Sequence, residues 1–240
     1  MARQLAAAGV EVVLVARRQD RLDALAREQA SSTHGVEVLA ADLIDPGDRR
    51  RVAQRLADPE RPIDVLVNCA GTGASGRFVD GDLNRYRQVI DLNITALVEL
   101  THVALGPMTT RRRGWVINIS SLGGHAPGPG FAVYSASKAF VTSFSESLHE
   151  EVRRAGVVVT AICPGATHTE FGEVSGVDDS VLPAMLWQEA DEVAAEALAA
   201  AAAGKAVRVT GTINRISAAL TTVLPRSANR RLSALVTDRL

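Results

Sequence analysis

The stretch WVINISSLGGHAPGPGFAVYSASKAFVTSFSESLHEEVRRAGVVVTAICPG, residues 115–165, is the most informative about the fold. It contains two short apolar runs, 115–119 and 157–163, separated by a pattern of helical period over 135–154. β-Branched residues favour strands, and two strands joined through a helix commonly run parallel. The stretch therefore predicts one strand–helix–strand unit whose strands are buried on both faces.

The same alternation continues on both sides of this unit. Further strands are predicted at 10–15, 36–39, 63–69 and 206–210, and further helices at 21–29, 46–56, 83–105 and 190–203. No repeat or low-complexity linker divides the 240 residues, a length that suits one large domain. The sequence predicts a single α/β domain, residues 1–240, with a doubly wound, Rossmann-like parallel sheet flanked by helices.

The beginning of the chain does not follow this order. Residues 2–8 form a helical pattern that Gly9 can end, so a helix precedes the first predicted strand. In a doubly wound sheet a central strand comes first, and the turn after it offers backbone N–H groups to a dinucleotide pyrophosphate. We expect the first strand and its glycine-rich turn to be absent from this sequence, and about 20 residues to precede it in the natural protein.

One glycine pattern imitates the expected turn. GTGASG, residues 71–76, spells G-x-G-x-x-G directly after the predicted strand 63–69. Residues 77–80 do not open a regular helix, and no acidic residue ends a following strand about 20 residues on, as a ribose contact requires. We interpret 71–76 as a flexible turn and not as a dinucleotide-binding loop.

Composition narrows the classes of function. Apolar residues make up 47% and charged residues 22%, as in ordinary folded domains, and a net charge of -1 gives no global attraction to nucleic acid. The histidines form no HExxH pair and the cysteines, Cys69 and Cys163, no CxxC motif, so no metal site is expected. We expect two buried thiols in a reducing compartment and, without a signal peptide or about 20 uncharged apolar residues in a row, a cytoplasmic protein.

Three residues of the opening stretch can carry chemistry. Ser121 precedes Tyr134 by thirteen residues and Lys138 follows Tyr134 by four, so the tyrosine and lysine share one face of the predicted helix. A nearby ammonium favours the phenolate, and lowering a tyrosine pKa by about 3 units corresponds to about 4 kcal/mol. Ser121 can hold a substrate oxygen by a hydrogen bond. Taken alone, a tyrosine and a lysine at this spacing are better explained as two surface residues that are neighbours on a helix.

Together with the order of elements, these residues resemble the short-chain dehydrogenase/reductase family over nearly the whole chain. In that family a serine, a tyrosine and a lysine at this spacing are catalytic, and the resemblance implies these roles for Ser121, Tyr134 and Lys138. Asn93, in IDLNITALVEL, is similar to the family's fourth catalytic residue, an asparagine inside a helix that positions a relay water. Because asparagine is a poor residue in a helix interior, we expect a local irregularity there.

The resemblance also implies a dinucleotide site. NCAG, residues 68–71, resembles the family's NNAG motif with Cys69 in place of the second asparagine, and PGATHT, residues 164–169, resembles PGxxxT, which contacts the nicotinamide end. Two positions that end the strand 36–39 match those that flank the adenine. The implied cofactor contacts are Asp42, Leu43, Asn68, Ala70, Gly71, Tyr134, Lys138, Pro164, Gly165 and Thr169.

The choice of cofactor rests on VLVARR, residues 13–18. Ala16 stands where a relative that prefers NAD carries an aspartate, whereas Arg17 and Arg18 offer cations suited to a 2′-phosphate. NADP(H) is therefore expected over NAD(H), against the simpler interpretation of two solvated arginines.

Residues 170–189 match the family's mobile substrate lid. Their apolar side chains favour a small hydrophobic alcohol, ketone or aldehyde as substrate, although a plain packing helix would show the same pattern. The side chains concerned are Val181, Leu182, Met185, Leu186 and Trp187.

Two further patterns concern partners. An apolar stripe on the catalytic helix matches the face that relatives use to form a dimer, so a homodimer or homotetramer is expected, unless the stripe is buried within the monomer. The stripe consists of Phe140, Val141, Phe144, Leu148 and Val152. Residues 214–240 form a basic amphipathic extension that we expect to cover the pocket or a subunit contact; contact with a membrane surface is the less favoured interpretation.

Two functions compete at this point. The first is an NADP(H)-dependent oxidoreductase that interconverts an alcohol and a ketone or aldehyde by hydride transfer, with Tyr134 moving the proton. The second, motivated by the missing glycine turn, is a non-catalytic or cofactor-poor relative.

Overall fold

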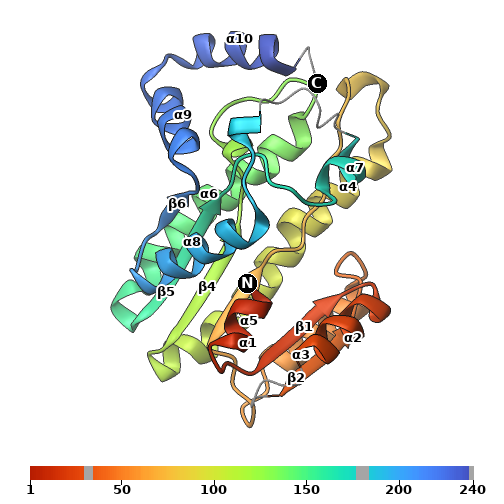
Figure 1. Ribbon diagram of the computed structural model, residues 1–240, viewed down its shortest axis with the longest axis vertical. Helices are drawn as coiled ribbons and strands as arrows, with labels where there is room; N and C mark the ends of the chain where they lie inside the picture. The colour runs from red at the N-terminus through yellow and green to blue at the C-terminus, as the bar shows by residue number, and fades with distance from the viewer. Residues whose placement is uncertain (30–34, 177–183, 238–240) are drawn as a thin grey trace.

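Helices and parallel strands alternate along the computed structural model, which describes residues 1–29, 35–176 and 184–237 (Figure 1). A strand forms in each predicted position. The strands are β1 (Val12–Ala16), β2 (Val36–Ala40), β3 (Val65–Asn68), β4 (Gly114–Ile119), β5 (Val157–Cys163) and β6 (Val207–Val209). The helices are α1 (Ala2–Ala7), α2 (Gln19–Glu28), α3 (Pro46–Leu56), α4 (Leu83–Ile90), α5 (Leu97–Arg111), α6 (Ala132–Val152), α7 (Phe171–Ser175), α8 (Ala190–Ala202), α9 (Thr212–Val223) and α10 (Arg226–Thr237).

The strands form two sheets where a single sheet was predicted. One contains β1 and β2, and the other runs β3-β4-β5-β6; every pairing in both is parallel. In Figure 1 the smaller sheet lies with α2 and α3 at the lower right, beside the larger one. Within the described residues, no strand bonds to the outer edges of β1 and β3, so the two sheets stay separate. The prediction of a Rossmann-like α/β fold with helices around parallel strands is nevertheless confirmed.

The centre of the larger sheet is the core of the molecule. Alternate residues of a strand point to opposite faces of the sheet. Residues of β4 and β5 pack against helices on both of these faces. On one face Val116 and Val159 pack against Met108 of α5, all three with no exposed surface. On the other face Ile117 and Ile162 pack against Ala197 of α8. Because helices cover both faces of these strands, their sequences are continuous apolar runs.

The predicted helix 83–105 is one continuous helix with a change of pitch in the middle. α4 begins at Asp82, whose carboxylate accepts a hydrogen bond from the backbone N–H of Asn84, and it runs through a π-helical segment, Asp91–Ala96, into α5. By length and composition alone, Leu83–Arg111 could span a membrane. Its residues Leu100, Ala104 and Met108 are buried against the sheet and α3, as in a core helix.

The end of the chain forms two helices. α9 follows β6 directly and buries Asn214 against the loop after β5, while Ile216, Leu220 and Val223 remain exposed. The apolar stripe predicted on α6 is divided. Val141 and Val152 belong to the core of the monomer, whereas Phe140 and Phe144 stack on each other with their ring centroids 5.6 Å apart, and Phe140 is exposed.

Candidate active site

The predicted catalytic residues come together at the carboxyl ends of β3, β4 and β5. Ser121 follows β4, Tyr134 and Lys138 lie one turn apart on α6, and Asn93 lies in the π-helical segment behind them. Ser121, Tyr134 and Lys138 line a cavity of about 1470 Å³. That volume exceeds the range usual for a small-molecule pocket because the cavity continues between β1 and β3.

The tyrosine and serine are held by the loop that joins β4 to α6. Ser121 begins a short 3₁₀ turn, Leu122–Gly124, and its hydroxyl accepts a hydrogen bond from the N–H of Gly123 at 3.0 Å. Leu122 in turn donates to the carbonyl of Pro164 at 2.8 Å, which ties the serine loop to the Pro–Gly turn after β5.

Burial sets the protonation of the tyrosine and lysine. Desolvation raises the pKa of Tyr134, and a hydrogen bond with Ser121 acts in the opposite direction. Desolvation also lowers the pKa of Lys138 from 10.5 to about 8. The lysine ammonium donates to the carbonyl of Ile119 at 2.8 Å and lies 5.8 Å from the centre of the tyrosine ring. The predicted lowering of the tyrosine pKa is therefore contradicted: the pKa of Tyr134 is raised, with burial as the largest cause.

Asn93 explains the change of pitch. Its amide oxygen accepts from the N–H of Thr72 at 2.9 Å, and its amide nitrogen donates to the carbonyl of Thr72 and to the hydroxyl of Ser137. The side chain thus joins the loop after β3 to α6, and the local irregularity expected at Asn93 is a π-helical turn. Gly71 lies close to both Asn93 and Lys138. A Cβ atom at this position would be 3.3 Å from Asn93 Oδ1 and 3.4 Å from Lys138 Nζ.

The predicted cofactor residues lie along the same cavity with one exception. Arg17, Arg18 and Leu43 line it on the side of the small sheet. On the other side it is lined by Asn68, Ala70, Gly71, Pro164, Gly165 and Thr169. Asp42 does not line the cavity. Its carboxylate accepts from the N–H of Ile44 at 3.0 Å, so it shapes the turn before α3 and leaves Leu43 to face the cavity.

Asn68 has a structural role besides lining the cavity. Its amide donates to Thr101 Oγ1 at 2.9 Å and to Asn118 Oδ1 at 2.8 Å, and Asn118 donates onward to Ser145. This polar chain crosses the sheet from α5 to α6 beneath the site and satisfies every amide group that it buries with a partner. The sequence motif assigned Asn68 to the cofactor site and did not indicate these partners.

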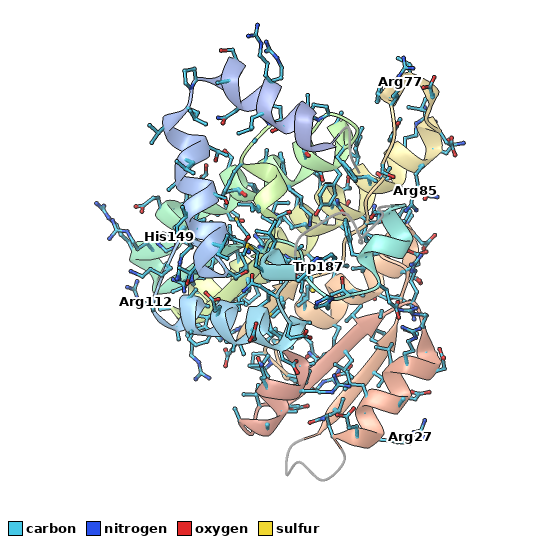
Figure 2. The ribbon with its side chains drawn as sticks, turned by 45° about the horizontal axis from the view of Figure 1, so that its top comes forward. Arg27, Arg77, Arg85, Arg112, His149 and Trp187 are labelled. Carbon is cyan, nitrogen blue, oxygen red and sulfur yellow. The ribbon has the colours of Figure 1, made fainter. Side chains whose placement is uncertain are left out.

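The loop 71–76 is more restrained than a flexible turn. Arg85, labelled in Figure 2, donates to the hydroxyl of Thr72 and to the carbonyl of Gly73. At the other end Ser75 donates to the carbonyls of Ser175 and Gly176. A 3₁₀ turn, Phe78–Asp80, follows, in agreement with the view that no dinucleotide-binding helix opens here.

Sequence reasoning missed the aromatic neighbours of Tyr134. Phe131 meets the tyrosine edge to face, with ring centroids 6.4 Å apart, and Phe171 of α7 lies against it at 5.2 Å. Gly73 makes room for Phe171, because a Cβ there would be 2.9 Å from the ring. Neither phenylalanine belongs to a motif, so only their closeness in sequence to Tyr134 and to Thr169 could have pointed to them.

The segment predicted as a lid begins with α7. At the other end of the segment, Gln188 forms an isolated parallel bridge with Thr167, and Trp187, labelled in Figure 2, stacks on His168 with ring centroids 4.6 Å apart. Trp187 lines the cavity. Of the apolar lid residues, Val181 and Leu182 lie outside the described residues.

A dinucleotide fits the two ends of this cavity. At one end Arg17 and Arg18 supply cations, and at the other Gly71 keeps the approach to Lys138 free of any side chain. Among the residues described here, no glycine turn followed by a helix N-terminus lines the middle of the cavity. The residues present would therefore hold the adenosine end and the nicotinamide end of a dinucleotide, and not its pyrophosphate.

A parallel α/β sheet with a buried tyrosine–lysine pair and an arginine-lined cavity at its carboxyl edge defines a Rossmann-like protein built for small-molecule chemistry. The family of short chain dehydrogenases matches residues 1–178. The chain belongs to that family.

Individual relatives agree with this assignment. Serine 3-dehydrogenase of Rhizobium radiobacter is 39% identical over 164 residues, which is 68% of this chain and 64% of that enzyme, less than two thirds of its length. Sulfoacetaldehyde reductase 2 of Chromohalobacter salexigens is 34% identical over 200 residues, 82% of this chain and 79% of that enzyme. The structure of a short-chain dehydrogenase from Sphingobium yanoikuyae in complex with NADPH has 33% identity and a TM-score of 0.83, covering 93% of this chain and 90% of that one.

Proposed function

We propose that this protein is an NADP(H)-dependent oxidoreductase that interconverts an alcohol and a ketone or aldehyde. The observation that carries the proposal is one continuous cavity with Ser121, Tyr134 and Lys138 at one end and Arg17 and Arg18 at the other. The family membership and the relatives, named as dehydrogenases and a reductase, support the reaction class.

The side chains divide the work of proton transfer. A bound nicotinamide would supply or accept the hydride. Tyr134, whose pKa is raised by burial, is a neutral phenol at neutral pH and can donate its proton to the carbonyl oxygen as the alcohol forms. Ser121, hydrogen-bonded to that phenol, can hold the same oxygen. Lys138, fixed to the Ile119 carbonyl, places a cation beside the phenol at pH values below about 8.

Asn93 acts through its neighbours. It fixes Thr72 at the floor of the cavity and Ser137 on the catalytic helix, so it positions Tyr134 and Lys138 relative to the loop after β3. No water or substrate contact is needed for that role.

Three features support the finer assignments. Arg17 and Arg18 suit the 2′-phosphate of NADP(H), the cofactor bound in the Sphingobium relative. Phe131, Phe171 and Trp187 line the cavity near the tyrosine and favour a substrate with an apolar group beside its carbonyl. The Phe140–Phe144 stack, in which Phe140 is exposed, offers a surface for a second copy of the chain in a homodimer or homotetramer.

The test is NADPH oxidation by purified protein with a panel of ketones and aldehydes, next to direct titration with NADPH and NADH. We expect turnover with at least one carbonyl, tighter binding of NADPH than of NADH, and turnover reduced at least about 100-fold in Tyr134→Phe with NADPH binding retained. Absence of NADPH binding at millimolar concentration would favour the competing function, a non-catalytic relative.

A further inference from the structure

A carboxylate occupies the cationic end of the cavity. Glu170, which precedes α7, places one carboxylate oxygen 2.8 Å from Arg18 Nη2 and the other against Arg21 Nη1. The two arginines lie at the beginning of α2, directly after β1, about 150 residues away from Glu170 in the sequence. Each guanidinium takes its own oxygen, so the group is a two-arginine clamp around one anion.

The clamp lies where the proposed function places a phosphate. Arg17, Arg18 and Glu170 all line the cavity, and Arg17 forms no ion pair within the described part of the chain. Hydrogen bonds from Arg21 and Arg18 lower the pKa of Glu170, so the carboxylate is an anion throughout the neutral range. All three clamp side chains are about half-exposed, so an anion from solution can reach the arginines.

The same short segment reaches the catalytic tyrosine. Phe171, the next residue, packs on the ring of Tyr134. A few residues on, Ser175 and Gly176 accept hydrogen bonds from Ser75 in the loop after β3. Residues 169–176 therefore connect the arginines of the small sheet with the tyrosine of the large sheet, and Glu170 is their charged contact with the small sheet.

We propose that Glu170 is an internal competitor for the 2′-phosphate of NADP(H): the carboxylate holds Arg18 and Arg21 until a phosphate displaces it, and its release frees residues 169–176 from the small sheet. The inference rests on the proposed use of NADP(H). A carboxylate and a phosphate in one clamp repel each other, so both do not bind these arginines together. The residue thus weakens the discrimination between NADP(H) and NAD(H) that its arginine partners provide.

The most direct test removes the negative charge of Glu170 and keeps the shape of its side chain. Wild type, Glu170→Gln and a matched control, Glu28→Gln, are titrated calorimetrically with 2′,5′-ADP and with 5′-ADP, which lacks the 2′-phosphate. Glu28 is a suitable control because it is also an exposed carboxylate, paired with one arginine, Arg3, at the opposite end of α2 from the clamp. We expect Glu170→Gln to bind 2′,5′-ADP about three- to tenfold more tightly, the range that two exposed ion pairs can supply.

The second nucleotide, 5′-ADP, and the control variant, Glu28→Gln, show whether a change in affinity is specific to the 2′-phosphate and to Glu170. 5′-ADP affinity should change less than about twofold in Glu170→Gln, and Glu28→Gln should bind both nucleotides as wild type does. Equal or weaker binding of 2′,5′-ADP by Glu170→Gln overturns the competitor and leaves NADP(H) use intact. Failure of every variant to bind 2′,5′-ADP at millimolar concentration overturns both proposals.

Hydrogen exchange tests the release of the segment without any turnover. In wild type, 2′,5′-ADP should speed exchange of the amides in residues 169–176, whereas 5′-ADP should not. In Glu170→Gln these amides should exchange faster before any ligand is added. Slower exchange in wild type with 2′,5′-ADP would mean that the segment stays on the clamp, and would overturn the release.

Discussion

The two sheets differ in how they are held. Along β4 and β5 nearly every residue is buried, and helices pack on both faces. In β1 and β2 Leu14 alone is buried, and the small sheet contacts the remainder of the molecule partly through polar links such as Arg49–Glu99 and the Glu170 clamp. The residues proposed to transfer the proton come from the densely packed sheet, whereas the arginines proposed to bind the nucleotide phosphate come from the loosely packed one.

This difference suits the two tasks. Proton transfer needs atoms fixed to within fractions of an ångström, which a close-packed core and the Asn68–Asn118–Ser145 chain supply. Discrimination of a phosphate needs charge at the right end of the cavity and tolerates a less rigid support. The following predictions test the contrast, starting with the largest expected effect.

Lys138→Met should separate activity from stability in the rigid sheet. Turnover should fall by at least about 100-fold, because the ammonium beside Tyr134 is lost. The free energy of unfolding should rise by about 1–2 kcal/mol, because burial, which lowers the pKa of Lys138 to about 8, disfavours its charge in the folded protein, while loss of the hydrogen bond to Ile119 offsets part of the gain. Steady-state kinetics and urea unfolding check both; a less stable variant would contradict the account.

Truncation of one buried residue in each sheet measures the contrast in packing. Ile162→Ala in β5 should lower the free energy of unfolding by about 3–4 kcal/mol, because the site is fully buried between helices. Leu39→Ala in β2 should cost about 1 kcal/mol, because its side chain is only partly buried. Denaturant unfolding of both variants gives the two values, and equal losses would show that the sheets are equally packed.

Arg49 is the polar link whose removal should loosen the small sheet. Its guanidinium is nearly buried, pairs with Glu99 of α5 at 2.8 Å and donates to the carbonyls of Leu43 and Ile44. Arg49→Leu should cost about 2 kcal/mol by leaving those acceptors unpaired. Hydrogen exchange should quicken in residues 36–56 and stay slow in β4 and β5; uniform acceleration would mean that the sheets unfold together.

The stability of the wild type should depend on pH through Lys138. Its folded pKa of about 8 lies below the ordinary 10.5, so between these values the unfolded chain binds more protons and stability rises with pH. The advantage of Lys138→Met should therefore be full below pH about 8 and shrink towards pH about 10.5. Paired unfolding curves at pH 7 and 9.5 test this, and a constant difference would place the lysine charge in solvent.

The smallest effect is expected at the exposed pair between Arg3 and Glu28. Both side chains are about half-exposed, and salt and side-chain entropy oppose such contacts. Arg3→Ala should leave the unfolding midpoint unchanged within error, whereas Arg49→Leu moves it. A shift of similar size in both would remove the distinction between exposed and buried links.

The sequence alone determined the order of strands and helices, the parallel α/β class and the spacing that joins Ser121, Tyr134 and Lys138. These features depend on local periodicity and on side chains one helical turn apart, which a linear pattern records. It also indicated the irregular turn at Asn93, since asparagine is disfavoured inside a helix.

Tertiary structure alone decided what depends on neighbours distant in sequence. It turned Asp42 into a turn residue, divided the α6 stripe between core and surface, and raised the pKa of Tyr134 by burying its side chain. It also placed Glu170 on Arg18 and Arg21 and Phe171 on Tyr134. Desolvation and long-range contacts follow from the packing of whole elements, and no local pattern in the chain encodes them.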